Sequence, residues 1–206
     1  ATKSIANRIK PILPSIINYT QTGFIKDRYI GENVRILEDL LDYVEEEKLP
    51  CLLFFSDFEK AFDSIDHSYL LDVLHHFNFG DSFIQWIKVF YKNASSSVLN
   101  NGYMTEGFQI ERGVRQGCPL SPYLFILGIE LLSLEVSRNS DIKGIHMHNI
   151  ELKNTLFADD ATFVTDGTET SFVTLINTLD DFAKISGLKL NNEKCNVLKA
   201  GASKIN

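Results

Sequence analysis

The sequence has few cysteines and no long apolar run, and these absences exclude several classes of protein. Its three cysteines lie far apart and form no C-x-x-C pair, so neither a disulfide framework nor a zinc knuckle is indicated. No stretch approaches the roughly 18 consecutive apolar residues of a membrane span, and no basic start followed by an apolar core suggests a signal peptide. We therefore expect an intracellular chain with reduced thiols and no membrane contact.

Basic residues are fewer than acidic ones, 20 against 27. The net charge of −7 and the isoelectric point near 5.2 argue against a protein that grips nucleic acid over its whole surface. The charge is uneven, because residues 1–30 are basic and residues 31–66 are acidic. In contrast, 44% of the 206 residues are apolar, enough for the core of one domain or two closely packed subdomains. The chain starts at Ala1 without a methionine, and we expect it to be a piece of a longer polypeptide.

The hydrophobic pattern predicts a mixture of helices and strands. Apolar residues at helical spacing over 3–18 are interrupted by Pro11 and Pro14, which should split that helix. The apolar run at 51–55 is typical of a central strand covered on both faces. Further helices are expected near 31–48, 66–78, 82–92, 123–138 and 169–186, and strands near 96–100, 107–111, 144–152, 154–158, 161–165, 188–191 and 194–199. This order indicates an α+β sheet with helices on one side.

Two adjacent acids interrupt the apolar run of residues 156–161. Neighbouring carboxylates repel each other, and their burial beside leucine and phenylalanine is costly unless a cation is present. Consecutive side chains of a strand point to opposite faces, so Asp159 and Asp160 are expected to form the tight turn of a hairpin. An ordinary exposed turn is the alternative, because aspartate is common in turns.

Asp57 repeats this pattern at the end of another apolar strand. Taken alone, Asp57 is explained as a strand-end turn residue. If its strand and the hairpin are neighbours in one sheet, however, the carboxylates of Asp57, Asp159 and Asp160 converge. Mg²⁺ prefers hard oxygen ligands and usually takes a few carboxylates together with substrate phosphates. Such a cluster suits phosphoryl transfer in which two ions about 3.5–4 Å apart act on the attacking hydroxyl and the leaving pyrophosphate.

Three longer blocks contain these acids and follow one another along the chain. They are Phe54–His67 (FFSDFEKAFDSIDH), Gly113–Phe125 (GVRQGCPLSPYLF) and Phe157–Asp160 (FADD). Together they closely resemble a reverse transcriptase, most of all the enzyme of LINE-type, non-LTR retrotransposons. The resemblance covers nearly the whole chain.

The resemblance implies the fold and its division into domains. It implies an α+β right-hand polymerase palm, an antiparallel sheet backed by helices, with part of the fingers. Residues 1–50 would be a partial fingers region, and residues 51–206 would be the palm with fingers-type insertions at about 66–112. The thumb would be absent.

The resemblance also assigns the metal ligands. Asp57 and Asp159 would bind two Mg²⁺ ions, with Mn²⁺ as an alternative, and Asp160 would support them. The backbone carbonyl of Phe58 would be a further ligand. Phe62 matches the aromatic residue that lies under the sugar and leaves no room for a 2′-hydroxyl, whereas a core aromatic is the alternative reading.

Other positions match residues that contact nucleotide and template. Gln116 and Gly117 match the loop that touches the incoming nucleotide and the template, where glycine lets the backbone come close. Arg112 and Arg115 are candidates for phosphate contacts, with a simple surface role as the alternative. Lys194 lies in the block after the catalytic hairpin and would protonate the leaving pyrophosphate. Lys189 is close by in the same block, and a solvated lysine is the simpler explanation.

The first residues resemble the end of the fingers region of this family. They include residues 7–11, the turn-like Gln21–Phe24 and Arg28. Asp27 replaces the glycine that usually precedes the arginine in this family. The resemblance therefore does not assign a nucleic-acid contact to Arg28. Asp63 is expected to cap or orient the helix that follows it rather than to bind metal.

The function implied by the resemblance is that of an RNA-directed DNA polymerase. The primer 3′-hydroxyl would attack the α-phosphate of a deoxynucleoside triphosphate on an RNA template. The partners would be the RNA template, the DNA primer, deoxynucleoside triphosphates and further domains of the same polypeptide, and the location would be nuclear if the target DNA is the primer. The alternatives are a group II intron or retron reverse transcriptase, and a catalytically inactive domain of this fold that binds nucleic acid or protein.

Overall fold

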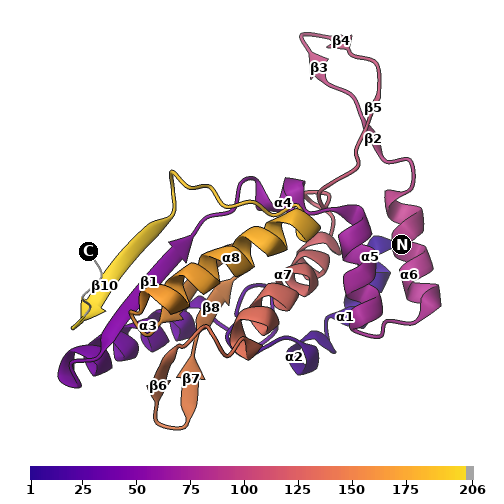
Figure 1. Cartoon of the computed structure of the whole chain (residues 1–206). Coiled ribbons are helices and arrows are strands. Elements are labelled where there is room, and N and C mark those ends of the chain that lie inside the picture. Colours follow the sequence, from indigo (N-terminus) through magenta and orange to yellow (C-terminus); the bar gives the residue numbers. More distant parts are fainter. Residues whose placement is uncertain (203–206) are drawn as a thin grey trace.

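The computed structural model describes residues 1–202 and is built on a four-stranded antiparallel sheet in the order β10-β1-β9-β8 (Figure 1). The central strand β1 (Pro50–Ser56) pairs with β10 (Asn196–Gly201) on one side and with β9 (Asp160–Thr165) on the other. Strand β8 (Asn154–Phe157) forms the opposite edge. Residues 51–54 of β1 are buried on both faces, which confirms the central strand predicted from the apolar run.

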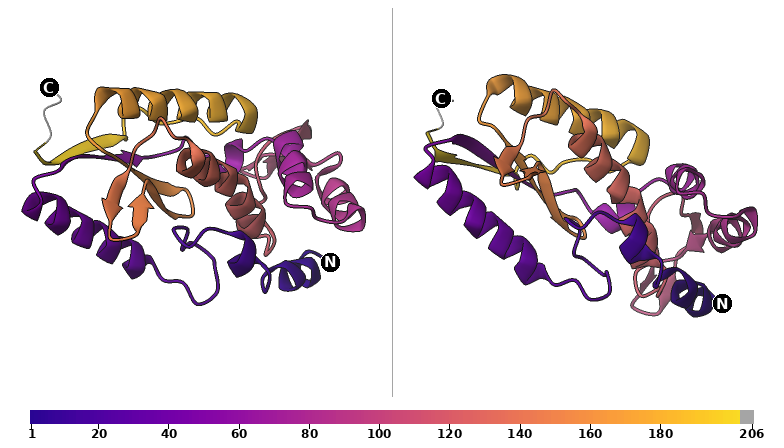
Figure 2. Two further views of the ribbon diagram at one scale, coloured as in Figure 1. Left: turned by 60° about the horizontal axis from the view of Figure 1, so that its bottom comes forward. Right: turned by 90° about the horizontal axis from the view of Figure 1, so that it is seen from below.

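Helices cover both faces of this sheet (Figure 2). Helices α7 (Ser121–Arg138) and α8 (Glu169–Ser186) lie on one face, and α3 (Ile30–Glu46) lies on the other. The prediction of helices on one side is therefore wrong. The reason is that β1 is apolar on both faces: Phe54 packs in the core with α7 and α8, whereas Leu53 packs against α3.

The remaining helices lie toward the other end of the molecule (Figure 1). They are α1 (Thr2–Ile9), α2 (Leu13–Ile16), α4 (Ala61–Ser64), α5 (His67–His76) and α6 (Asp81–Tyr91). The first helical segment is split around Pro11, as predicted. The residue that caps the next helix is Asp66 and not Asp63. Asp63 lies inside α4, whereas the carboxylate of Asp66 accepts hydrogen bonds from backbone amides at the start of α5.

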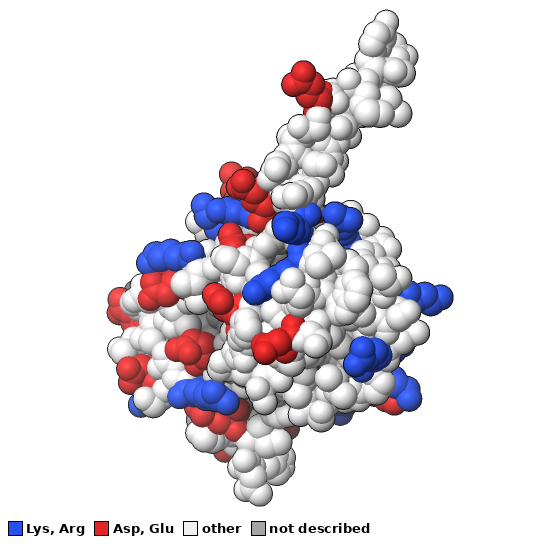
Figure 3. All heavy atoms as spheres, turned by 90° about the vertical axis from the view of Figure 1, so that its right-hand side faces the viewer, with Lys and Arg blue, Asp and Glu red and all other residues white. Residues whose placement is uncertain are grey.

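Residues 95–109 form a narrow arm that projects from the body (Figures 1 and 3). Its paired strands are β2 (Ser95–Ser96), β3 (Leu99–Asn100), β4 (Tyr103–Met104) and β5 (Phe108–Gln109). The turn at residues 101–102 confirms the hairpin predicted there. Figure 3 shows no charged side chain at the tip of the arm.

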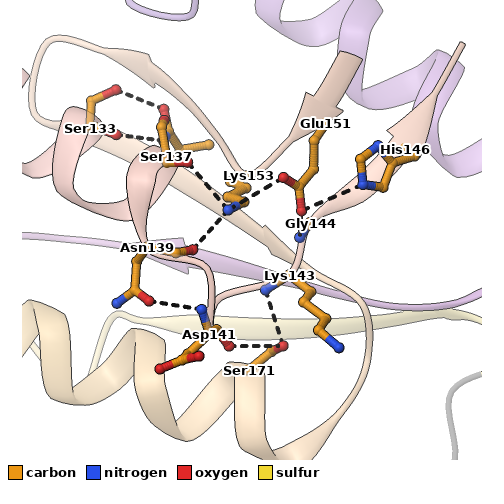
Figure 4. Close-up of polar contacts among 11 residues, drawn as sticks. Ser133, Ser137, Asn139, Asp141, Lys143, Gly144, His146, Glu151, Lys153 and Ser171 are labelled. Carbon is orange, nitrogen blue, oxygen red and sulfur yellow. Dashed lines mark hydrogen bonds and ion pairs between the residues drawn. The ribbon is translucent and has the colours of Figure 1, made fainter. Parts of the chain in front are cut away.

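A buried lysine joins β8 to the end of α7 (Figure 4). Lys153 is 6% exposed, and its Nζ donates to the backbone oxygens of Ser137 and Asn139 at 3.3 and 2.9 Å. It also forms an ion pair of 3.4 Å with Glu151 on strand β7 (Ile150–Leu152). Strand β7 pairs with β6 in the short hairpin expected near 144–152, and β6 spans Ile145–Met147. These bonds fix the end of β8 that is remote from its hairpin turn.

Two other expectations concern the beginning and the end of the chain. The strand expected at 188–191 is wrong, since this segment makes only a single bridge, from Leu190 to Phe58.

Residues 1–50 are in close contact with the sheet, because α3 packs on it and Gln21 forms a parallel bridge with Leu156 of β8. The division into partial fingers and palm stays a prediction, and residues 203–206 of the expected palm lie outside the described residues. None of the helices within residues 1–202 combines the length and hydropathy needed to cross a membrane.

Candidate active site

The sheet brings Asp57 and Asp159 to the same place. Strand β1 pairs with β9 so that Ser56 lies opposite Ala161, and Asp57 follows at the end of the sheet where β8 turns into β9. Both carboxylates line one cavity of about 660 Å³, which we call the carboxylate cavity. Its lining residues are Asp57, Phe58, Glu59, Lys60, Ala61, Ser64, Asp159, Asn191 and Lys194. Two acids far apart in the sequence are therefore neighbours, as the strand ends suggested.

The hairpin turn differs by one residue from the expected one. Phe157 pairs with Asp160, so the two turn residues are Ala158 and Asp159, and Asp160 is the first residue of β9. The φ angle of Ala158 is 57°, which lies in the left-handed region. A residue in this conformation lets the chain reverse its direction within two residues. As a result Asp159 is at the tip, whereas Asp160 is exposed and is not among the residues that line the cavity.

The surroundings of Asp159 raise the pKa of its carboxyl group. The main cause is burial, and the nearby negative charges of Asp160 and Asp57 add to it. A divalent cation would relieve this repulsion, and carboxylate oxygens are ligands that Mg²⁺ prefers, so the pair fits such an ion. Within residues 1–202, no group of three or more His, Cys, Asp or Glu side chains is arranged to hold a metal ion. Further ligands would then be backbone oxygens, such as the predicted carbonyl of Phe58, or water and substrate phosphates.

A positive charge also lies beside the carboxylates. The Nζ atom of Lys194 is 3.8 Å from Oδ2 of Asp57, and this lysine lines the carboxylate cavity. Its segment is held in place because the amide of Asn191 donates to the backbone oxygen of Asp57 at 2.8 Å. Sequence reasoning missed Asn191 as a cavity residue, although it lies in the block that carries Lys194.

The second set of predicted residues lines a separate cavity of about 420 Å³, the loop cavity. It is lined by Phe62, Arg115, Gln116, Gly117, Cys118, Pro119, Ser121 and Pro122. The ring of Phe62 stacks on Phe125 with 4.3 Å between centroids, and its other neighbour is Phe24, edge-on at 6.5 Å. Phe62 is half-buried, so it packs against the core and also lines the cavity.

The loop of residues 112–117 is attached to α4. The amide of Val114 donates to the backbone oxygen of Phe62 at 2.7 Å, and Nε2 of Gln116 donates to the Asp63 carboxylate at 3.3 Å. Gly113 has a φ of 83°, and a Cβ there would be 2.7 Å from the Asp63 backbone. The glycine thus permits the close approach that places Gln116 beside Phe62.

The other two arginines considered as nucleic-acid contacts, Arg112 and Arg28, have partners within the chain. Arg112 is 3.8 Å from the carboxylate of Asp66 and lines neither cavity, so the structure does not bring it to the other candidates. The guanidinium of Arg28 donates to the backbone oxygens of residues 14, 17, 18 and 21. Arg28 therefore orders the N-terminal segment, a role that local sequence patterns do not reveal.

Comparisons with known proteins show the family of the chain. The family model of reverse transcriptase (RNA-dependent DNA polymerase) matches residues 1–204. The chain is 38% identical over 128 residues to an uncharacterized 149 kDa protein of transposon TX1 from Xenopus laevis, covering 62% of this chain and 10% of that protein. It is 32% identical over 185 residues to the retrovirus-related Pol polyprotein of a type-2 retrotransposable element from Drosophila melanogaster, covering 89% of this chain and 17% of the polyprotein.

Solved structures support the fold independently. Telomerase from Candida tropicalis, solved with a fragment of telomeric RNA, superposes with a TM-score of 0.67 at 12% identity, over 96% of this chain and 33% of that one. A truncated apo form gives 0.66 at 14% identity, over 100% and 41%. The palm with part of the fingers is thereby confirmed as the fold, and the chain spans only a minor part of each relative. The chain belongs to the reverse transcriptase family, and its relatives place it with the LINE-type, non-LTR retrotransposon members.

Proposed function

We propose that this chain carries the catalytic site of an RNA-directed DNA polymerase that extends a DNA primer on an RNA template. The observation that carries the proposal is that Asp57, Asp159 and Lys194, from three separate sequence blocks, line one cavity. The relatives favour a retrotransposon enzyme over the group II intron or retron alternative. Its partners would be the template, the primer, deoxynucleoside triphosphates and further parts of the same polypeptide.

In this proposal Asp57 and Asp159 hold two Mg²⁺ ions, or Mn²⁺ in their place. Bound ions would supply positive charge beside the attacking 3′-hydroxyl and the departing pyrophosphate. The carbonyl of Phe58 completes the ligand set, and Asp160 adds negative charge from the adjoining strand. The chain contributes positioning and charge, because phosphoryl transfer needs little covalent chemistry from the protein.

The other residues act on the nucleotide. Lys194 is close enough to Asp57 to reach a phosphate in the same cavity, where its ammonium group would give a proton to the pyrophosphate. Phe62 would exclude a 2′-hydroxyl by its bulk. Gln116 and Gly117 would contact the nucleotide and the template from the loop cavity, and Arg115 would contact a phosphate there.

Primer extension on an RNA template tests this function. The chain should be expressed both alone and with the sequence that flanks it in its gene, and Asp159→Asn should abolish extension, because it removes the charge that binds the cation. The matched control is Asp180→Asn on the exposed surface of α8, which should extend normally. Undiminished extension by Asp159→Asn would contradict the assigned site, and RNA binding without any extension by the parent would favour the inactive alternative.

A further inference from the structure

The turn that carries Asp159 needs support from outside its own hairpin. In a two-residue turn, the backbone groups of the turn residues are not all satisfied by the strand ladder and require other partners. Ala158 is only 4% exposed, so water does not readily supply these partners. Its φ of 57° is also unfavourable for a residue with a Cβ atom. Contacts from another part of the chain must therefore hold Ala158.

Gln21 supplies these contacts. Its side chain is completely buried, and Oε1 accepts hydrogen bonds from the amides of Ala158 at 3.0 Å and Gly23 at 2.8 Å. Its Nε2 donates to the backbone oxygen of Ala158 at 3.4 Å. A single side-chain amide thus contacts both backbone polar groups of the residue that precedes Asp159.

Gln21 itself is fixed by the segment to which it belongs, residues 20–23, which we call the support segment. The amide of Thr22 donates to the backbone oxygen of Leu156 at 2.9 Å, and the amide of Leu156 donates to the backbone oxygen of Thr20 at 2.8 Å. The backbone oxygen of Gln21 accepts a hydrogen bond of 2.7 Å from Arg28. The position of the Gln21 amide is therefore set by β8 and by Arg28, not by the turn that it contacts.

We propose that Gln21 is a positioning residue, whose side-chain amide holds Ala158 so that the Asp159 carboxylate points into the carboxylate cavity. This inference rests on the proposed function, because it concerns the same site. Gln21 is completely buried, so its loss acts on the site through its two backbone partners, Ala158 of the turn and Gly23 of the support segment, and not through contact with a substrate. A small displacement of a reacting group lowers the maximal rate more than the affinity for substrate.

Gln21→Met is the variant that tests this, because methionine keeps the length and volume but forms no hydrogen bond with Ala158. In the chain without metal, amide hydrogen exchange at Ala158 should accelerate by about tenfold or more. In single-turnover primer extension, the maximal rate should fall roughly 10- to 100-fold, with the half-saturating nucleotide concentration changed by less than about threefold. If Gln21→Met does not fold, Gln21→Asn, which is polar but one methylene shorter, should show the same changes.

Lys153→Met is the matched control, because it removes two part-buried hydrogen bonds to backbone oxygens, together with the ion pair to Glu151, at the other end of β8 (Figure 4). It should lower the melting temperature, whereas exchange at Ala158 and the rate per folded molecule should stay within about threefold of the parent. The proposal is overturned if Gln21→Met keeps the parental exchange rate at Ala158. It is also overturned if Gln21→Met and Lys153→Met lower the extension rate per folded molecule by the same factor.

The two proposals fail in different ways. If the parent shows no extension on any primed RNA, either alone or with its flanking sequence, the proposed function is wrong. The exchange measurement still decides whether Gln21 holds the turn, because it requires neither metal nor substrate. If the parent is active and exchange at Ala158 does not depend on Gln21, only the inference about Gln21 is wrong.

Discussion

At the scale of single residues, Phe62 combines packing against aromatic rings with a place in the wall of a cavity. It stacks on Phe125, lies nearly perpendicular to the ring of Phe24, and lines the loop cavity together with Gln116. Packing against neighbouring rings restricts how far the Phe62 side chain can move, and a side chain that excludes a group as small as a hydroxyl must be held in place. This environment fits the sugar selectivity that the resemblance implies.

Phe62→Val should weaken discrimination against ribonucleotides. A smaller side chain leaves room for the 2′-hydroxyl, and we expect the relative kcat/KM for ribonucleotides to rise roughly 10- to 100-fold. Competition between a ribonucleotide and its deoxy counterpart in primer extension measures this ratio. Phe77→Val is the control, since Phe77 is half-buried against the same core and lines neither cavity. An unchanged ratio in Phe62→Val would show that the ring does not select the sugar.

At the scale of elements, the support segment and the β8–β9 turn are packed backbone against backbone. A Cβ atom on Gly23 would lie 2.3 Å from the amide nitrogen of Ala158. This contact involves main-chain atoms, so no side-chain rotation can relieve it. The space between the two segments is therefore large enough only for glycine.

Gly23→Ala should separate the support segment from the turn. We expect a loss of about 1–3 kcal/mol in the free energy of unfolding, which is typical of overpacking, and a lower rate of primer extension. Urea unfolding and extension assays measure the two effects. Gly107→Ala in the arm is the control, because the nearest atom to its Cβ would be 3.7 Å away. Normal stability and normal extension in Gly23→Ala would contradict the close contact.

Local patterns predicted most elements but not all of their details. The apolar run of β1, the split at Pro11 and the end of α8 at Gly187 follow from periodicity and from residues with restricted or permissive backbones. The turn was misplaced by one residue because aspartate is a better turn residue than alanine, whereas the pairing of strands made Ala158 adopt the left-handed conformation.

The residues of the candidate site could be predicted where a local sequence motif contains them. Asp57, Asp159 and Lys194 could be named from their blocks, and the structure places them around one cavity. Gln21 could not be identified as a partner of the turn, because its contact with Ala158 spans 137 residues and leaves no periodic signal. The role of Arg28 could not be predicted for a similar reason, since the carbonyl groups that it binds become neighbours only in the fold.

At the scale of the whole molecule, stability depends on a buried acid in α7. Glu130 is 1% exposed, accepts a hydrogen bond from the amide of Asn18 at 2.8 Å, and has a second oxygen without a partner among the described residues. Burial raises its pKa to about 7, although the Asn18 hydrogen bond and the charge of Arg28 oppose this. A carboxyl group whose pKa is raised by folding stabilises the protein below its ordinary pKa, and this contribution is lost as the pH rises through the folded value.

Glu130→Gln should remove this pH dependence. Relative to the parent, the variant should gain about 3 kcal/mol in the free energy of unfolding between pH 4.5 and pH 8, since one pH unit corresponds to about 1.4 kcal/mol. Urea titrations at several pH values measure the difference. Glu135→Gln, on the exposed side of the same helix, should follow the parental profile. Parallel profiles for Glu130→Gln and the parent would show that Glu130 does not titrate in this range.

The backbone contact between Gly23 and Ala158 also limits how such a chain can evolve. A larger residue at position 23 has no room unless the turn moves, and a moved turn no longer meets the amide of Gln21. Substitutions at these three positions are therefore expected to be coupled, so that a change at one is tolerated best when another changes with it. The support segment and the turn would then vary together, although they are distant in the sequence.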